Sequence, residues 1–107
     1  MSPQIKQLAL PRLNGIQPTL ESTVIKLSEE VGELARLIGK GQRMSGESYS
    51  DTSDIQREWL MEVVGELLDV AQTTITMAFK LEEEYDISLE DGMENHINKL
   101  KHKKYII

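Results

Sequence analysis

Two pairs of acidic residues stand at helical spacing inside otherwise apolar stretches of this chain. Glu30 and Glu33 lie in EEVGELARLIGK, and Glu66 and Asp69 lie in VVGELLDVAQ. Because side chains three residues apart on a helix are neighbours, each pair offers two carboxylates to one point. Two facing helices would bring all four around hard cations such as Mg²⁺, which prefer oxygen ligands. The pattern therefore predicts metal-assisted phosphate chemistry.

Four carboxylates beside a hydrophobic core need a physical reason. Within a few ångströms they repel one another and lose hydration, so burying them without cations is unfavourable. Divalent ions reverse this, because two Mg²⁺ formally balance four carboxylates and leave coordination positions for water and phosphate oxygens. The alternative is that each pair is only a solvated helix flank, since Glu is a common helix former. Spacing alone leaves both interpretations open.

Helical phase refines the membership of each acidic set. At about 100° per residue, Glu30 and Glu33 fall on one flank of their apolar stripe, whereas Glu29 falls on the opposite side. Glu29 is therefore predicted to be a solvated or supporting acid. On the second helix the same construction places Glu62 on the strip that carries the second pair. Glu29 and Glu62 are additional candidate acids.

The first acidic pair lies in a predicted helix over residues 20–38. Its apolar residues recur at helical period, and Thr19 precedes it as a candidate N-cap. Gly39 and Gly41 mark its predicted end. The next residues, 41–53, are rich in Ser, Gly and Asp and show no periodicity. They predict a loop, which at this place is a candidate lid.

Two more helices and a short N-terminal element complete the predicted fold. The second acidic pair lies in a helix over about residues 54–83, and a last helix follows Ser88, a candidate N-cap. Residues 3–10 predict a short helix or ordered arm, which Pro11 closes. No stretch has the pattern of a strand. The predicted fold is all-α, a helical bundle of three main helices plus a short N-terminal helix or arm, in a single domain over residues 1–107.

The long helix also predicts an oligomer. About 30 residues at 1.5 Å each would span roughly 45 Å, whereas a compact chain of this size has a radius of gyration near 13 Å. The helix must then project beyond a monomeric globule. Because its apolar residues persist to the far end, we expect a second copy of the chain to cover them.

Composition excludes several other classes of protein. The chain has no cysteine, which removes disulfides, thiolate nucleophiles and cysteine-zinc sites. Its net charge of −6 argues against a nucleic-acid partner, because such binding depends on Lys and Arg neutralising phosphates. No apolar run is long enough for a membrane span, and the N-terminus lacks the pattern of a secretory signal. We expect a cytoplasmic protein with no membrane partner.

The basic C-terminal sequence KLKHKKY, which contains Lys99, runs against this acidic balance. A small anionic ligand needs cations to offset the acidic field, and these lysines would supply some of them. The alternative is a solvated helix end whose positive charge complements the helix dipole.

At the level of motifs, KLSEEVGELARLIGK followed by GELLDVAQTTITMA resembles the MazG-like all-α nucleoside triphosphate pyrophosphohydrolases, whose signature is ExxE followed by ExxD. The ending HINKLKHKKY is also similar to the Lys-rich last helix of small MazG-like proteins. The interval between the two acidic motifs is longer here than the family commonly shows.

The resemblance implies an activity, a cofactor and an assembly. Members of this family bind Mg²⁺ with four acids, here Glu30, Glu33, Glu66 and Asp69, and Mn²⁺ is a possible substitute. They hydrolyse a nucleoside triphosphate substrate to the monophosphate and pyrophosphate, as homodimers or homotetramers. By the same likeness Lys26 and Lys99 are candidates for phosphate binding.

The sequence thus predicts a Mg²⁺-dependent nucleotide-pool pyrophosphohydrolase that acts on (d)NTPs. The alternative from another class is a non-catalytic helical oligomer, an adaptor or a nucleotide or metal sensor that has kept the scaffold.

Overall fold

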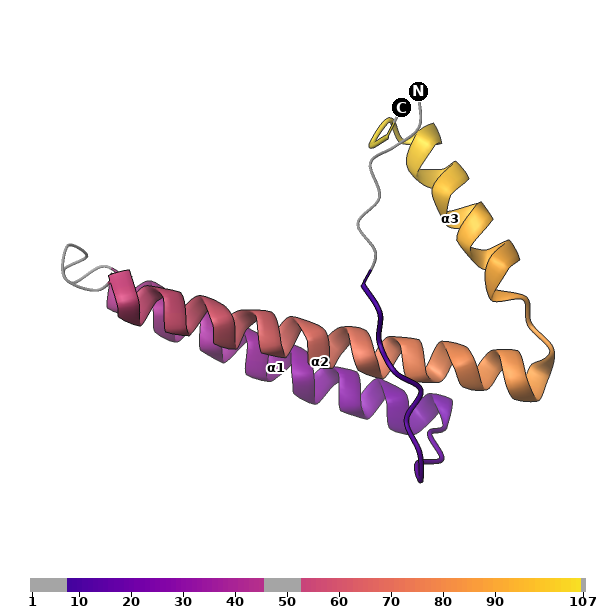
Figure 1. The fold of residues 1–107 in the computed structure, drawn as a ribbon, viewed down its shortest axis with the longest axis horizontal. Helices are drawn as coiled ribbons and strands as arrows, with labels where there is room; N and C mark the ends of the chain where they lie inside the picture. The colour runs from indigo at the N-terminus through magenta and orange to yellow at the C-terminus, as the bar shows by residue number, and fades with distance from the viewer. Residues whose placement is uncertain (1–7, 46–52, 107) are drawn as a thin grey trace.

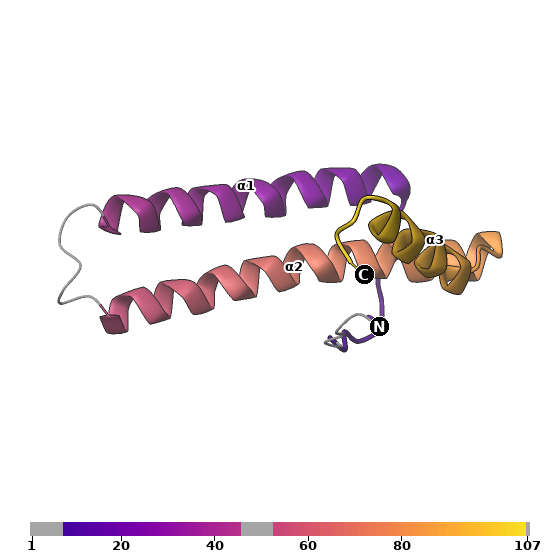
Figure 2. The ribbon, with the colours of Figure 1, turned by 90° about the horizontal axis from the view of Figure 1, so that it is seen from above.

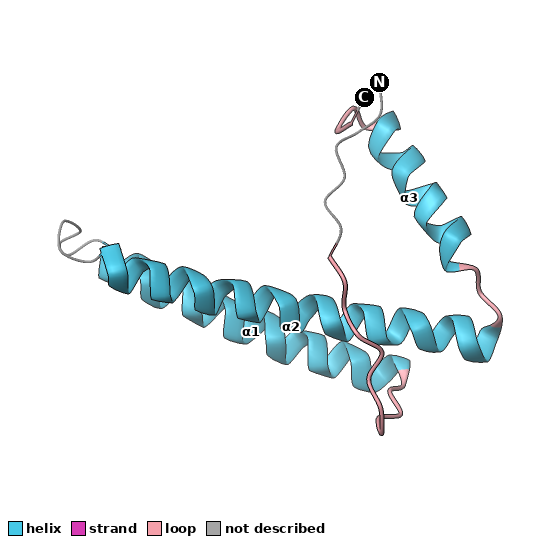
Figure 3. Ribbon diagram, viewed as in Figure 1, coloured by secondary structure: helices cyan, strands magenta, loops and turns pink. Residues whose placement is uncertain are grey.

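The computed structural model describes residues 8–45 and 53–106 of the chain (Figure 1). Three helices account for their regular structure: α1 (Leu20–Ser45), α2 (Ser53–Tyr85) and α3 (Leu89–His102). The described residues contain no strand (Figure 3). The prediction of an all-α fold with three main helices is therefore confirmed.

Helix α1 begins at a reciprocal cap and ends later than predicted. The Thr19 amide donates to Ser22 Oγ at 2.8 Å, and the Ser22 amide donates to Thr19 Oγ1 at 3.0 Å, which satisfies two amides at the helix start. The predicted end at Gly39 is wrong, because α1 continues to Ser45. The predicted loop is correspondingly shorter, and its residues 46–52 lie outside the described residues.

Tertiary packing explains why α1 passes through its glycines. Trp59 of α2 donates its indole N–H to the Leu37 carbonyl at 2.8 Å, two residues before Gly39. A helical glycine costs only about 1 kcal/mol relative to alanine, and packing of this kind offsets such a cost.

Helices α1 and α2 form an antiparallel hairpin in which they lie side by side (Figure 2). Near its open end the Thr23 hydroxyl of α1 approaches Met77 Sδ of α2 at 3.1 Å. Towards the other end Trp59 bonds to Leu37. These two contacts set the register, and the middle of α1 therefore lies opposite the middle of α2. The two acidic pairs occupy those middles.

The N-terminal segment, which we define as residues 8–19, is an extended arm across the hairpin rather than a helix (Figure 1). The Gln72 side-chain amide donates to the Pro11 carbonyl at 2.9 Å. Arg12 forms an ion pair with Glu83 and stacks 4.7 Å from the centre of the Phe79 ring. The predicted element at 3–10 is not helical at residues 8–10, and its residues 3–7 lie outside the described residues.

Helix α3 leaves the hairpin and packs little against it (Figure 1). The connection turns at Asp86, whose φ of 53° is left-handed, and Ser88 Oγ accepts the Asp91 amide at 3.1 Å as the predicted N-cap. Among the described residues α3 contacts α2 but not α1. The chain is elongated, with a radius of gyration of 17.7 Å.

This shape leaves little hydrophobic core within one chain. Among the described residues Met77, at 7% exposure, is the one buried apolar side chain, whereas Val24, Met61 and Met93 are each more than 60% exposed. Apolar side chains along the long helix are thus exposed in one chain, and oligomerisation stays a prediction. Within the part of the chain that is described, no helix has both the length and the apolar character that a membrane span needs.

Candidate active site

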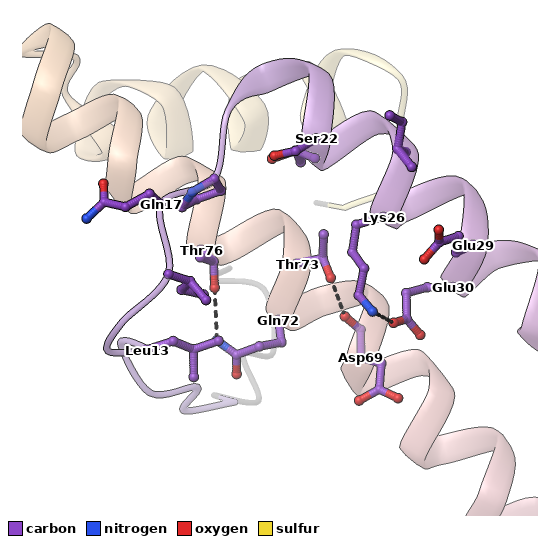
Figure 4. A pocket seen from close by; sticks show the side chains of 14 residues that line it. Leu13, Gln17, Ser22, Lys26, Glu29, Glu30, Asp69, Gln72, Thr73 and Thr76 are labelled. Atoms are coloured by element: carbon purple, nitrogen blue, oxygen red, sulfur yellow. Dashed lines mark hydrogen bonds and ion pairs between the residues drawn. The ribbon is translucent and has the colours of Figure 1, made fainter.

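Three of the four predicted acids converge between the two helices of the hairpin. Glu30 comes from α1, and Glu66 and Asp69 come from α2. Each offers one carboxylate oxygen, and the three oxygens lie within 4.8 Å of one another. Figure 4 shows Glu30 and Asp69 approaching from facing helices. The register of the hairpin explains this meeting, since it places the centres of α1 and α2 opposite each other.

Two oxygens of this cluster are buried without a partner. Glu30 is only 6% exposed, and the Oε2 atoms of Glu30 and Glu66 have no hydrogen-bond donor among the described residues. An unpaired buried carboxylate oxygen is costly, because it has lost water and gained nothing in exchange. A cation bound between the helices would remove that cost. The donor set, all carboxylate oxygen, fits a hard divalent ion.

The raised pKa of Glu66 also indicates that this carboxylate is destabilised when it is charged and no cation is bound. Burial raises the pKa of the Glu66 carboxyl above 4.5, and the nearby negative charges of Glu33, Asp69 and Glu30 raise it further. Holding a proton there relieves the repulsion among the acids, and a bound cation would relieve it in the same way.

Lys26 partly balances the cluster from the α1 side. Its Nζ lies 3.0 Å from Glu30 Oε1, one turn along the helix (Figure 4). This hydrogen bond to Glu30 is the main cause of a raised pKa for Lys26, which keeps the ammonium charged. Lys26 thus satisfies one oxygen of Glu30 and leaves the other, Oε2, without a donor.

The remaining predicted acids lie around this cluster rather than in it. Glu33 is outside the group of three, although it is close enough to affect Glu66, and with Glu62 it lines a cavity of about 530 Å³. Glu29 is exposed and lines a second cavity, of about 790 Å³, on the other side of the cluster. Lys99 lies on α3, outside both cavities.

Sequence reasoning missed two basic residues beside the acids. Arg36 and Lys40 line the same cavity as Glu33, Glu66 and Asp69. The available signal was their spacing, because Arg36 follows Glu33 by three residues and Lys40 follows Arg36 by four, which places all three on one strip of α1. They bring positive charge to an acidic site from its own helix.

Comparison with known proteins identifies the domain that carries this site. The family model of the MazG nucleotide pyrophosphohydrolase domain matches residues 18–105. The chain belongs to the MazG family. The matched range includes all three helices and both acidic motifs of this MazG domain, and it begins just after most of the N-terminal segment. No curated protein and no solved structure matches the chain.

Proposed function

We propose that this chain is a Mg²⁺-dependent nucleoside triphosphate pyrophosphohydrolase, which hydrolyses (d)NTP to (d)NMP and pyrophosphate. The observation that carries the proposal is the pair of buried, unpartnered oxygens on Glu30 and Glu66, two acids of the three-carboxylate cluster inside a MazG domain. Solvated helix flanks would instead expose their carboxylates to water.

The acid cluster would supply the ligands of the divalent ion. Glu30, Glu66 and Asp69 would hold it, with Glu33 as the fourth acid at the edge of the neighbouring cavity. Mg²⁺ supplies the positive charge that offsets both the carboxylates and the phosphates of the substrate. Mn²⁺ suits the same oxygen ligands and is expected to substitute.

The chain's own residues have separable tasks in the reaction. Water adds across the bond between the α- and β-phosphates: an oxygen–phosphorus bond forms, the bridging bond breaks and pyrophosphate leaves with the bonding electrons. Glu62, which is exposed and lines the cavity beside the cluster, would accept the proton that the water releases. Arg36 and Lys40 offer donors to the phosphate oxygens.

The apolar surface supports a homo-oligomer, either a dimer or a tetramer. Residues on both hairpin helices, such as Val24, Val31 and Leu67, are at least half exposed in one chain. Large apolar side chains exposed in this number along two helices are normally covered by a partner. Sedimentation of the purified protein tests this, and a monomer at micromolar concentration would contradict it.

A direct assay tests the activity. Purified protein is incubated with Mg²⁺ and a panel of NTPs and dNTPs, and pyrophosphate and the monophosphate are measured together. We expect both products in equal amounts from at least one substrate, and none when EDTA is present. Release of inorganic phosphate alone, or no product from any member of the panel, would contradict the proposal. The absence of any product would favour the alternative of a non-catalytic sensor.

A further inference from the structure

Two cavities of different chemistry meet at the acid cluster. The larger, about 790 Å³, lies between the N-terminal segment, α1 and α2, and the smaller, about 530 Å³, lies farther along the hairpin. Asp69 lines both. A ligand that crosses the cluster would therefore have one end in each cavity.

Away from the acid cluster, the larger cavity has the lining of a site for an uncharged group. Its apolar wall includes Leu13, Ile16 and Ile25, and the hydroxyls of Thr73 and Thr76 add neutral polar groups from α2. The charged residues of this cavity, Lys26, Glu29 and Glu30 with Asp69, belong to the end nearest the cluster (Figure 4). Its volume lies within the range of roughly 300–1,000 Å³ for small-molecule pockets.

The smaller cavity combines basic donors for phosphate with four acids, two of which belong to the proposed metal site: Glu33, Glu62, Glu66 and Asp69. Arg36 and Lys40 supply cationic donors, and Gly65 leaves space on the α2 side, where an added Cβ would meet no atom within 4 Å. Phosphate oxygens accept hydrogen bonds from both kinds of basic side chain.

We propose that the nucleotide lies across Asp69, with its nucleoside in the larger cavity and its terminal phosphates in the smaller one, and that the N-terminal segment selects the base through Leu13 and Ile16. The inference rests on the proposed function. The family match begins at residue 18, so this wall of the cavity lies outside the matched domain. Base preference would then be a property of this chain's own segment.

The segment is fixed well enough to act as a wall. Gln72 donates to the Pro11 carbonyl at 2.9 Å and to Thr76 Oγ1 at 3.2 Å, and Lys80 reaches Gln17 at 3.4 Å. The contacts at Pro11 and Gln17 tie the segment to α2 on either side of Leu13 and Ile16. The two side chains are 41% and 47% exposed, so their truncation should leave the fold intact.

Two double variants separate the two ends of the substrate. L13A/I16A should raise KM by about tenfold or more and change the ranking of bases in kcat/KM, because lost apolar contacts affect each base differently. R36A/K40A should lower kcat/KM for every base by the same factor. L8A is the matched control, since Leu8 is on the same segment, 70% exposed and outside the cavity. It should match the wild-type protein.

Product binding gives a readout that does not depend on turnover. In calorimetric titrations with Mg²⁺, L13A/I16A should weaken the affinity for a nucleoside monophosphate but not for pyrophosphate, and R36A/K40A should do the reverse. A second outcome is that L13A/I16A turns over substrate at the wild-type rate, with the same ranking of bases and the same affinity for the monophosphate. That outcome would overturn the proposed orientation of the nucleotide and leave the proposed function intact. The predicted binding pattern without any turnover would support the orientation and refute the activity.

Discussion

The acids of this site divide into an inner pair, Glu30 and Glu66, and an outer set that is exposed to solvent. The contrast is sharpest between neighbours in the chain: Glu30 is 6% exposed with an unpartnered oxygen, whereas Glu29 is exposed to solvent. The residue type is the same in both cases. The two residues differ in their position on α1, because Glu30 is on the face that packs against α2 and Glu29 is not. Burial, rather than residue type, therefore identifies the carboxylates that need a cation.

The largest expected effect comes from neutralising an inner acid. Glu30→Gln or Glu66→Gln should reduce turnover by more than about 100-fold, since loss of even the residues that support metal ligands costs up to that much. The steady-state rate of pyrophosphate release measures this. Glu29→Gln is the matched control, one residue from Glu30, and should lose less than about tenfold. Equal losses in the two variants would erase the distinction between inner and outer acids.

The next effect is stabilisation by the metal. Mg²⁺ at 100 times its Kd should raise the free energy of unfolding by about 2.7 kcal/mol, because it binds the folded chain and not the unfolded one. Thermal melts with increasing Mg²⁺ measure the shift. Glu66→Gln should remove most of it, and Asp69→Asn, which alters an exposed ligand, should retain part. A midpoint that does not respond to Mg²⁺ or Mn²⁺ would favour a non-catalytic protein.

Without metal, Glu66 should make stability depend on pH. The pKa of Glu66 is raised above 4.5 in the folded chain, so the folded state holds this proton more tightly than the unfolded state does. The stabilisation is therefore complete below about pH 4.5 and is lost as pH rises through the raised pKa. Urea denaturation in EDTA between about pH 4 and pH 8 measures the trend.

The control for this pH dependence is again Glu66→Gln, which cannot ionise. Its stability should fall less across the same range, and near neutral pH the metal-free variant should be more stable than the wild-type protein. A wild-type chain whose metal-free stability rises in parallel with that of the variant would show that Glu66 is not under repulsion.

Local rules predicted much of this arrangement. The helical spacing of the acids, the caps at Thr19 and Ser88 and the all-α class all follow from interactions within a few residues, which sequence displays directly. Spacing also placed Glu30 and Glu33 on one flank. It could not show that Glu30 enters the cluster and Glu33 does not, because that depends on how α1 is rotated against α2.

Long-range packing decided the features that sequence missed. The end of α1 was predicted from Gly39, whereas the Trp59–Leu37 contact across the hairpin holds the helix beyond it. The N-terminal segment became a cavity wall through Gln72, 61 residues away from Pro11 in sequence. Lys99 lies on α3, which contacts α2 but not α1, and it lines neither cavity of its own chain, so its role in phosphate binding stays a prediction.

The smallest expected effect separates two helical glycines, Gly65 of α2 and Gly39 of α1. Gly65 precedes the inner acid Glu66 and lines the smaller cavity, whereas Gly39 lines neither cavity, and an added Cβ at either would meet no atom within 4 Å. Alanine should therefore stabilise the chain by up to about 1 kcal/mol at both positions. Only Gly65→Ala should also lower kcat/KM, because its methyl group would occupy space that phosphate needs. Urea midpoints and the pyrophosphate assay measure the two properties, and undiminished activity in Gly65→Ala would mean that the space beside Glu66 is not where the substrate's phosphates bind.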